Sequence, residues 1–148
     1  MKEKEHELQV QCVSWFRYRY PYLRSLFYSV PNGGLRNKAV ASKLKAEGLN
    51  PGISDLVLDL PSYNYHGLKI EMKAGTEQSE EQKIYQITVE ASGYKYIVCK
   101  SLEDFIQTIT EWIRNCDKNI ISRLCSINCT IDNERQKRIR DRIRNRHG

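Results

Sequence analysis

The sequence predicts one α/β domain built around a small mixed β-sheet. The chain has 148 residues, which is the size of a single domain. Hydrophobic residues make up 40% of it and charged residues 28%, as in a globular protein. Helical spacing of apolar residues gives way repeatedly to short β-branched runs, in the order α-β-α-β-β-α-β-α over residues 5–114. This alternation is typical of helices packed on a sheet.

The first half of the pattern contains two helices and one strand. Residues 5–20 carry apolar side chains at helical spacing and are followed by Pro21, which ends a helix. Residues 26–30 are aromatic and β-branched and lead into a turn, so they form the first predicted strand. A second helix is expected over residues 36–47.

The second half begins with a predicted hairpin. Two apolar segments, residues 55–60 and 68–73, are separated by a short polar turn and should pair as antiparallel strands. A helix, a strand and another helix then follow over residues 79–91, 94–99 and 102–114. We therefore assign the domain to residues 1–114.

Residues 115–148 form a C-terminal extension, predicted as an added helix or a mobile arm. The chain has 24 Lys and Arg residues against 18 Asp and Glu, a net charge of +6. Residues 135–148 contain seven basic residues and one acidic residue, an excess that equals this net charge. Such a segment suits binding to phosphate backbones, although it is also typical of a solvated or frayed terminus. The predicted nucleic-acid contacts are Arg138, Arg140, Arg142 and Arg144.

Cysteine usage and hydropathy favour an intracellular, cytoplasmic protein without a membrane segment. No apolar run approaches the roughly 20 residues that span a bilayer, and the charged N-terminus lacks a signal-peptide pattern. The five cysteines are odd in number and scattered, so reduced thiols are expected. Cys116, Cys125 and Cys129 lack the paired spacing of a zinc site.

Three polar residues on the predicted hairpin could bind a metal ion or take part in catalysis. Asp55 begins one strand, and Glu71 and Lys73 share one face of its partner because strand side chains alternate. Two carboxylates brought together in this way suit a hard divalent cation such as Mg²⁺, and the lysine would lie beside the reacting water. The alternative is a capping aspartate and an ordinary exposed Glu–Lys pair.

The surrounding motifs resemble those of a known nuclease superfamily. Pro51-Gly52-Ile53-Ser54-Asp55, Glu71-Met72-Lys73 and Ser79-Glu80-Glu81-Gln82 resemble the core of the PD-(D/E)xK, or restriction-endonuclease-like, superfamily. Residues 5–9, 31–34 and 44–52 make the chain similar to a stand-alone VRR-NUC domain, the virus-type replication-repair nuclease family. Ser54 departs from the pattern, since proline would stand there, but proline is not a ligand.

The resemblance implies a role for each matching residue. Asp55 and Glu71 would bind Mg²⁺ or Mn²⁺, with the Met72 carbonyl as a third ligand. Lys73 would orient or activate the attacking water. Glu5 would be the acidic site residue of the first helix. Independently of the resemblance, Glu5 lies on the apolar face of that helix and Glu7 on the opposite side, which favours Glu5 for this role.

Three further residues match the family, but each also has a purely structural or less specific explanation. Gln82 corresponds to a family glutamine, but Ser79-x-x-Gln82 is equally a helix capping box. Asn32 and Arg36 could contact phosphate, although Asn-Gly is first of all a turn signal.

The implied fold is an αβββαβ core with the basic extension outside it. The implied function is metal-dependent hydrolysis of DNA phosphodiester bonds that leaves 5′-phosphate and 3′-hydroxyl ends. Stand-alone members of the family suggest resolution of four-way (Holliday) junctions by a homodimer, and a phage or mobile-element origin. The alternatives are a flap or single-strand nuclease of the same fold, or a nucleic-acid-binding module without catalysis.

Overall fold

The computed structural model describes residues 2–30 and 38–144, and its elements follow the predicted order. The helices are α1 (Lys2–Arg19), α2 (Lys38–Ala46), α3 (Glu80–Ala91), α4 (Leu102–Arg114) and α5 (Lys118–Arg144), with a 3₁₀ helix, η1, over Pro21–Leu26. The strands are β1 (Phe27–Ser29), β2 (Leu56–Leu58), β3 (Leu68–Met72) and β4 (Lys95–Cys99).

The four strands form one mixed sheet in the order β1-β2-β3-β4. β1 pairs with β2, and β2 with β3, in antiparallel fashion, which confirms the predicted hairpin. β4 is parallel to β3, and α3 makes the crossover between them. The mixed α/β fold with an αβββαβ core is therefore confirmed.

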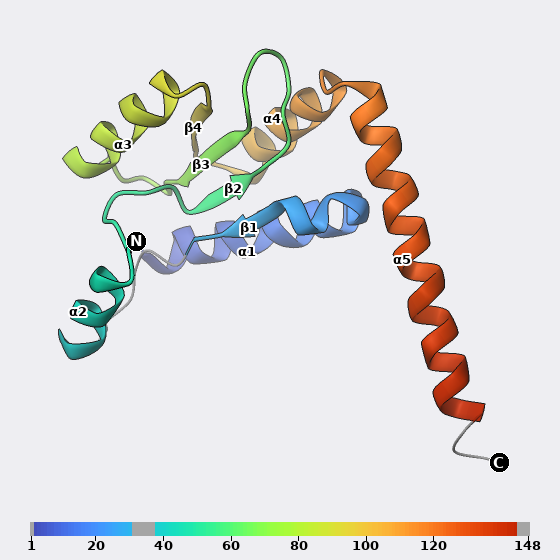
Figure 1. Ribbon diagram of the computed structural model, residues 1–148. Coiled ribbons are helices and arrows are strands. Elements are labelled where there is room, and N and C mark those ends of the chain that lie inside the picture. The colour runs from blue at the N-terminus through green and yellow to red at the C-terminus, as the bar shows by residue number, and fades with distance from the viewer. Residues whose placement is uncertain (1, 31–37, 145–148) are drawn as a thin grey trace.

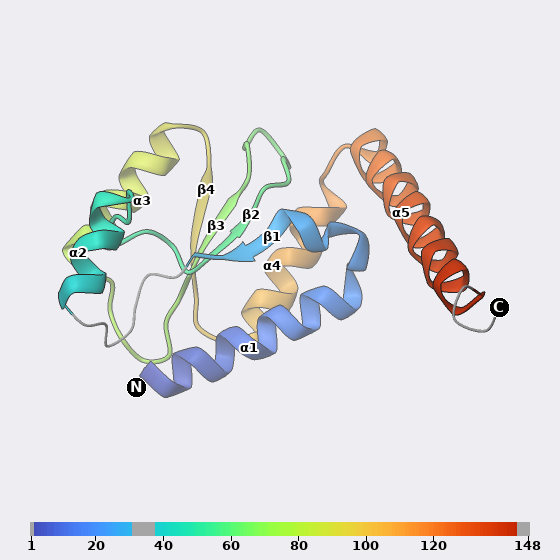
Figure 2. The ribbon, with the colours of Figure 1, turned by 60° about the horizontal axis from the view of Figure 1, so that its bottom comes forward.

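One face of the sheet packs on α1 and α4, which lie on the side away from α3 (Figure 2). Alternate residues of the strands point to this side because side chains alternate along a strand. Cys12 and Phe16 of α1 and Phe105 and Ile109 of α4 are fully buried there. The strands add Phe27, Leu56, Leu58, Leu68, Ile70, Met72 and Cys99.

The other face of the sheet is partly covered by α3, which contacts β4. A ring contact between Tyr85 of α3 and Tyr96 of β4 marks this packing, with centroids 6.2 Å apart. The loop that leads into β2 also approaches α3 closely. Gly52 lies so near the backbone of Glu81 that a side chain has no room. The loop before Asp55 is thereby fixed against the start of α3.

The C-terminal extension is a helix of 27 residues that projects away from the domain (Figure 1). Ile120, Ile121 and Leu124 in its first turns pack against the core. Farther along, Ile127 and Ile139 are exposed. The extension, predicted as an added helix or a mobile arm, is a helix in the structure. No helix in the described part of the chain is long and apolar enough to cross a membrane.

Replacing Gly52 should destabilise the fold more than replacing a glycine with open surroundings. Gly52→Ala would place Cβ 2.6 Å from the carbonyl carbon of Glu81, at a φ of +78° that alanine disfavours. We expect the free energy of unfolding to fall by about 2–4 kcal/mol in urea denaturation. The matched control is Gly48→Ala, where φ is +97° and nothing lies within 4 Å. Equal losses in the two variants would contradict the proposed packing.

Candidate active site

Asp55 lies directly before β2 and is held by the neighbouring strand. Its Oδ2 accepts a hydrogen bond of 2.8 Å from the backbone N–H of Met72. Its own carbonyl oxygen accepts from the N–H of Val30, at 2.9 Å. The antiparallel pairing of β2 with β3 therefore brings Asp55 to the end of β3 where Glu71 and Lys73 lie.

Glu71 is a buried carboxylate with three side-chain partners. Only 1% of its surface is exposed. The Lys73 Nζ lies 3.3 Å from Glu71 Oε1, and the Gln82 side-chain amide donates to the same oxygen. The Tyr96 hydroxyl donates to Oε2 at 3.4 Å. The predicted pair of Glu71 and Lys73 is thus buried, which excludes an ordinary solvated surface pair.

Burial disfavours the charged form of both carboxyl groups of the site. Burial raises the pKa of Glu71 to about 7, and repulsion from Asp55 adds to the rise while Lys73 opposes it. Burial also raises the pKa of Asp55, with the Met72 N–H opposing and the charge of Glu5 contributing. One ammonium group does not offset this local excess of carboxylate.

Glu5 reaches the site from the N-terminal end of α1. Its Oε1 accepts a hydrogen bond of 2.5 Å from the Thr76 hydroxyl and one of 3.4 Å from the backbone N–H of Ala74. Both donors belong to the loop that leaves β3 just after Lys73. Glu5 is half-buried and Glu7 is exposed, in agreement with the helical-wheel argument.

Gln82 takes part in both of the arrangements considered for it. Its side-chain oxygen accepts from the Ser79 N–H at 2.9 Å, and its own N–H donates to the Ser79 hydroxyl at 3.3 Å, which completes the capping box. Its side-chain nitrogen donates to Glu71. The amide group therefore connects the start of α3 to the buried carboxylate.

The remaining candidate residues are not brought into this group. Asn32 and Arg36 lie outside the described residues. Arg138 and Arg142 are exposed on the distal part of α5. Arg140 and Arg144 belong to the same helix.

The donor set fits a hard divalent cation. Asp55 and Glu71 supply carboxylate oxygens, and burial raises the pKa of both, so a bound cation would stabilise their charged forms. Within residues 2–30 and 38–144, no three or more His, Cys, Asp or Glu side chains are grouped to hold a metal ion. The remaining coordination would come from a backbone carbonyl and water, the ligation that Mg²⁺ commonly has.

Three residues near the site were not found from the sequence. Tyr96 faces Glu71 because β4 runs parallel to β3 in the observed register, and this pairing could not be read from the chain alone. Thr76 lies in an irregular loop, where no periodicity indicates which side chain turns toward Glu5. A third, Gln78, donates to the Tyr96 hydroxyl at 3.4 Å.

Comparison with solved structures finds the same fold in a "VRR_NUC domain protein". The TM-score is 0.66 and the sequence identity 26%, over 76% of this chain and 90% of that one. No protein-family model matches the chain, and neither does any curated protein.

The mixed sheet flanked by helices, together with this likeness, defines a nuclease domain of the restriction-endonuclease-like class. Within that class the chain carries a VRR-NUC domain. The family resemblance of the sequence motifs is thereby confirmed.

The two contacts of Gln82 can be separated by mutation. Ser79→Ala breaks the capping box alone and should lower the free energy of unfolding by about 1 kcal/mol, with DNA cleavage nearly unchanged. Gln82→Ala also removes the amide that contacts Glu71, so cleavage should fall about tenfold or more. Urea denaturation and cleavage rates measure the two effects. Equal cleavage by the two variants would leave Gln82 as a cap only.

Proposed function

We propose that the chain is a divalent-metal-dependent DNA endonuclease selective for branched DNA. The observation that carries this proposal is the buried pair of Glu71 and Lys73 beside the half-buried Asp55, within a VRR-NUC fold. A binding module without catalysis has no need to bury a carboxylate and a lysine next to a second carboxylate, which is costly unless the charges serve a function.

Asp55, Glu71 and the Met72 carbonyl are the residues that would hold Mg²⁺ or Mn²⁺. A divalent cation bound there would supply positive charge that polarises the phosphodiester and lowers the pKa of water. The Met72 N–H fixes Asp55 at 2.8 Å, and Gln82 and Tyr96 fix Glu71, so the carboxylate oxygens are preorganised for a ligand.

Lys73 is the residue proposed to act on the nucleophile. Its ammonium group is 3.3 Å from Glu71 Oε1 and its side chain is 11% exposed, so it stays beside the carboxylates. In that place it can orient the attacking water and offset negative charge on the phosphate in the transition state. Glu5, held by Thr76, would accept a hydrogen bond from the same water network.

The four arginines at the end of α5 are proposed to contact the phosphate backbone. They belong to one continuous helix, α5, whose C-terminal end projects away from the domain (Figure 1). Their charge would attract DNA of any sequence and would position it without selecting a base.

We propose further that two copies act together on a four-way junction. Symmetric cuts in a junction require two active sites related by a two-fold axis, which a homodimer supplies. A flap or single-strand nuclease of the same fold would need only one copy. The two alternatives therefore differ in assembly as well as in substrate.

Removing the proposed metal ligands should abolish metal binding and cleavage together. Asp55→Asn and Glu71→Gln should lose Mn²⁺ binding in isothermal titration calorimetry and lower cleavage by about 10²-fold or more. Lys73→Met is the matched control, since it should retain Mn²⁺ binding while losing cleavage to a similar extent. Cleavage that persists undiminished in EDTA would refute the metal-dependent mechanism.

Shortening α5 should weaken DNA binding equally for all sequences. Deletion of residues 135–148 should flatten the salt dependence of binding, by about 0.9 in slope for each lost phosphate contact. The double variant Arg138→Gln/Arg142→Gln keeps the helix length and should flatten the slope by a smaller amount. An unchanged slope, with loss of the oligomer, would instead make α5 an assembly element.

Substrate selectivity is tested by offering one preparation three labelled DNAs: a four-way junction, a flap and a linear duplex. We expect the junction to be cut fastest, with paired incisions. Light scattering coupled to gel filtration should give the mass of a dimer. A monomer that prefers the flap would favour the alternative substrate.

A further inference from the structure

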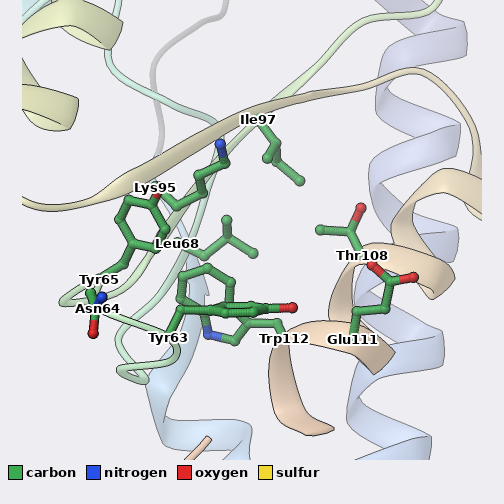
Figure 3. A pocket seen from close by; sticks show the side chains of 9 residues that line it. All are labelled: Tyr63, Asn64, Tyr65, Leu68, Lys95, Ile97, Thr108, Glu111 and Trp112. Atoms are coloured by element: carbon green, nitrogen blue, oxygen red, sulfur yellow. The ribbon is translucent and has the colours of Figure 1, made fainter. Parts of the chain in front are cut away.

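A concave site lies at the other end of β3 from Glu71. It is a pocket of about 380 Å³ between the loop joining β2 to β3, the edge strand β4 and α4 (Figure 3). Leu68 and Ile97 supply apolar surface from the two strands. None of the proposed catalytic or metal-binding residues lines it.

Tyr63 projects over this pocket from a strained backbone. Its φ is +53°, the one positive value among non-glycine residues in the described part of the chain. This region is uncommon for a bulky residue, and such strain is concentrated at functional sites. The ring packs edge-on against Trp112 with centroids 6.0 Å apart, and its hydroxyl accepts from the Asn115 amide at 2.9 Å. Although 57% exposed, Tyr63 is thus fixed at the rim.

Tyr65 forms a second fixed aromatic surface beside it. Its ring is stacked with that of Trp112, with centroids 6.1 Å apart and an interplanar angle of 28°. The Lys95 Nζ lies 5.7 Å from the Tyr65 ring centroid. The pocket therefore combines exposed aromatic rings with an ammonium group, the pairing that binds a stacked base and its phosphate.

The wall contributed by α4 is polar. Thr108 and Glu111 line it, and the Glu111 carboxylate accepts one hydrogen bond, from Gln107 at 3.2 Å. Glu111 is exposed, so its other oxygen is open to a ligand. A carboxylate accepts hydrogen bonds from the amino group of cytosine, which thymine lacks.

We propose that this pocket binds one unpaired nucleobase of the DNA substrate. The base would stack on Tyr63 and Tyr65 and donate its amino group to Glu111, with a neighbouring phosphate near Lys95. Leu68 precedes Glu71 by three residues on β3, about 10 Å at the rise of a strand, and the two side chains point to opposite faces of the sheet, so DNA that reaches both sites would pass around the edge strand β4. The inference rests on the proposed function, because it takes DNA as the ligand.

The test measures binding alone, with the full chain in EDTA, by fluorescence anisotropy. The probes are a blunt duplex and the same duplex with a short overhang of either cytidine or thymidine. We expect the cytidine overhang to bind tightest. Tyr65→Ala should weaken that binding about tenfold and leave the blunt duplex unchanged, whereas Tyr65→Phe should bind normally. Tyr18→Ala, which removes a tyrosine 88% exposed on α1, is the matched control.

A second variant tests the base contact without disturbing the aromatic packing. Glu111→Ala should remove the preference for cytidine over thymidine, and Glu103→Ala, an exposed glutamate of the same helix outside the pocket, should retain it. The proposal is overturned if the overhang adds no affinity, or if Tyr65→Ala weakens binding to all three probes alike. Metal-dependent cleavage is measured separately. If the pocket does not bind an unpaired base, the nuclease proposal is unaffected. If the chain does not cleave DNA, the binding assay still tests the pocket.

Discussion

The burial of Glu71 is the constraint on which the rest of the site depends. A carboxylate with 1% exposure is unfavourable unless its oxygens are hydrogen-bonded and its charge is offset. Lys73, Gln82 and Tyr96 supply these contacts from the residue that follows β3, from α3 and from β4. Even with these contacts, burial, to which repulsion from Asp55 adds, raises the pKa of Glu71 to about 7. A site that disfavours its own charges in this way is suited to bind a cation.

The site is assembled from segments far apart in the chain, each fixed by ordinary structural rules. Hairpin pairing fixes Asp55 beside Met72. A capping box fixes the start of α3 and with it Gln82. The packing of α1 against α4 and β3 brings the beginning of the chain to the loop after Lys73, where Thr76 holds Glu5. Stability and chemistry use the same contacts here, which explains why a helix cap such as Gln82 can also touch the buried carboxylate.

Electrostatic and aromatic contacts with DNA are assigned to different parts of the molecule. The excess of positive charge over residues 135–148 equals the net charge of the whole chain, +6, and would attract any phosphate backbone. The pocket beside β4 has fixed tyrosines, one lysine and one glutamate, a set that can distinguish an unpaired base from a paired one. Neither region overlaps the carboxylate site, so affinity, recognition and chemistry can be altered independently.

The sequence by itself determined the order of the elements, the hairpin that joins Asp55 to Glu71, and the inward face of Glu5, because these follow from periodicity and short-range pairing. The order of the motifs along the chain is by itself sufficient to indicate the VRR-NUC family. Only the tertiary structure decided that β4 lies parallel to β3 and turns Tyr96 toward Glu71, that Thr76 holds Glu5, and that Tyr63, Tyr65 and Trp112 enclose a pocket. These contacts join residues of different elements, and their register and packing depend on the whole fold rather than on any local pattern.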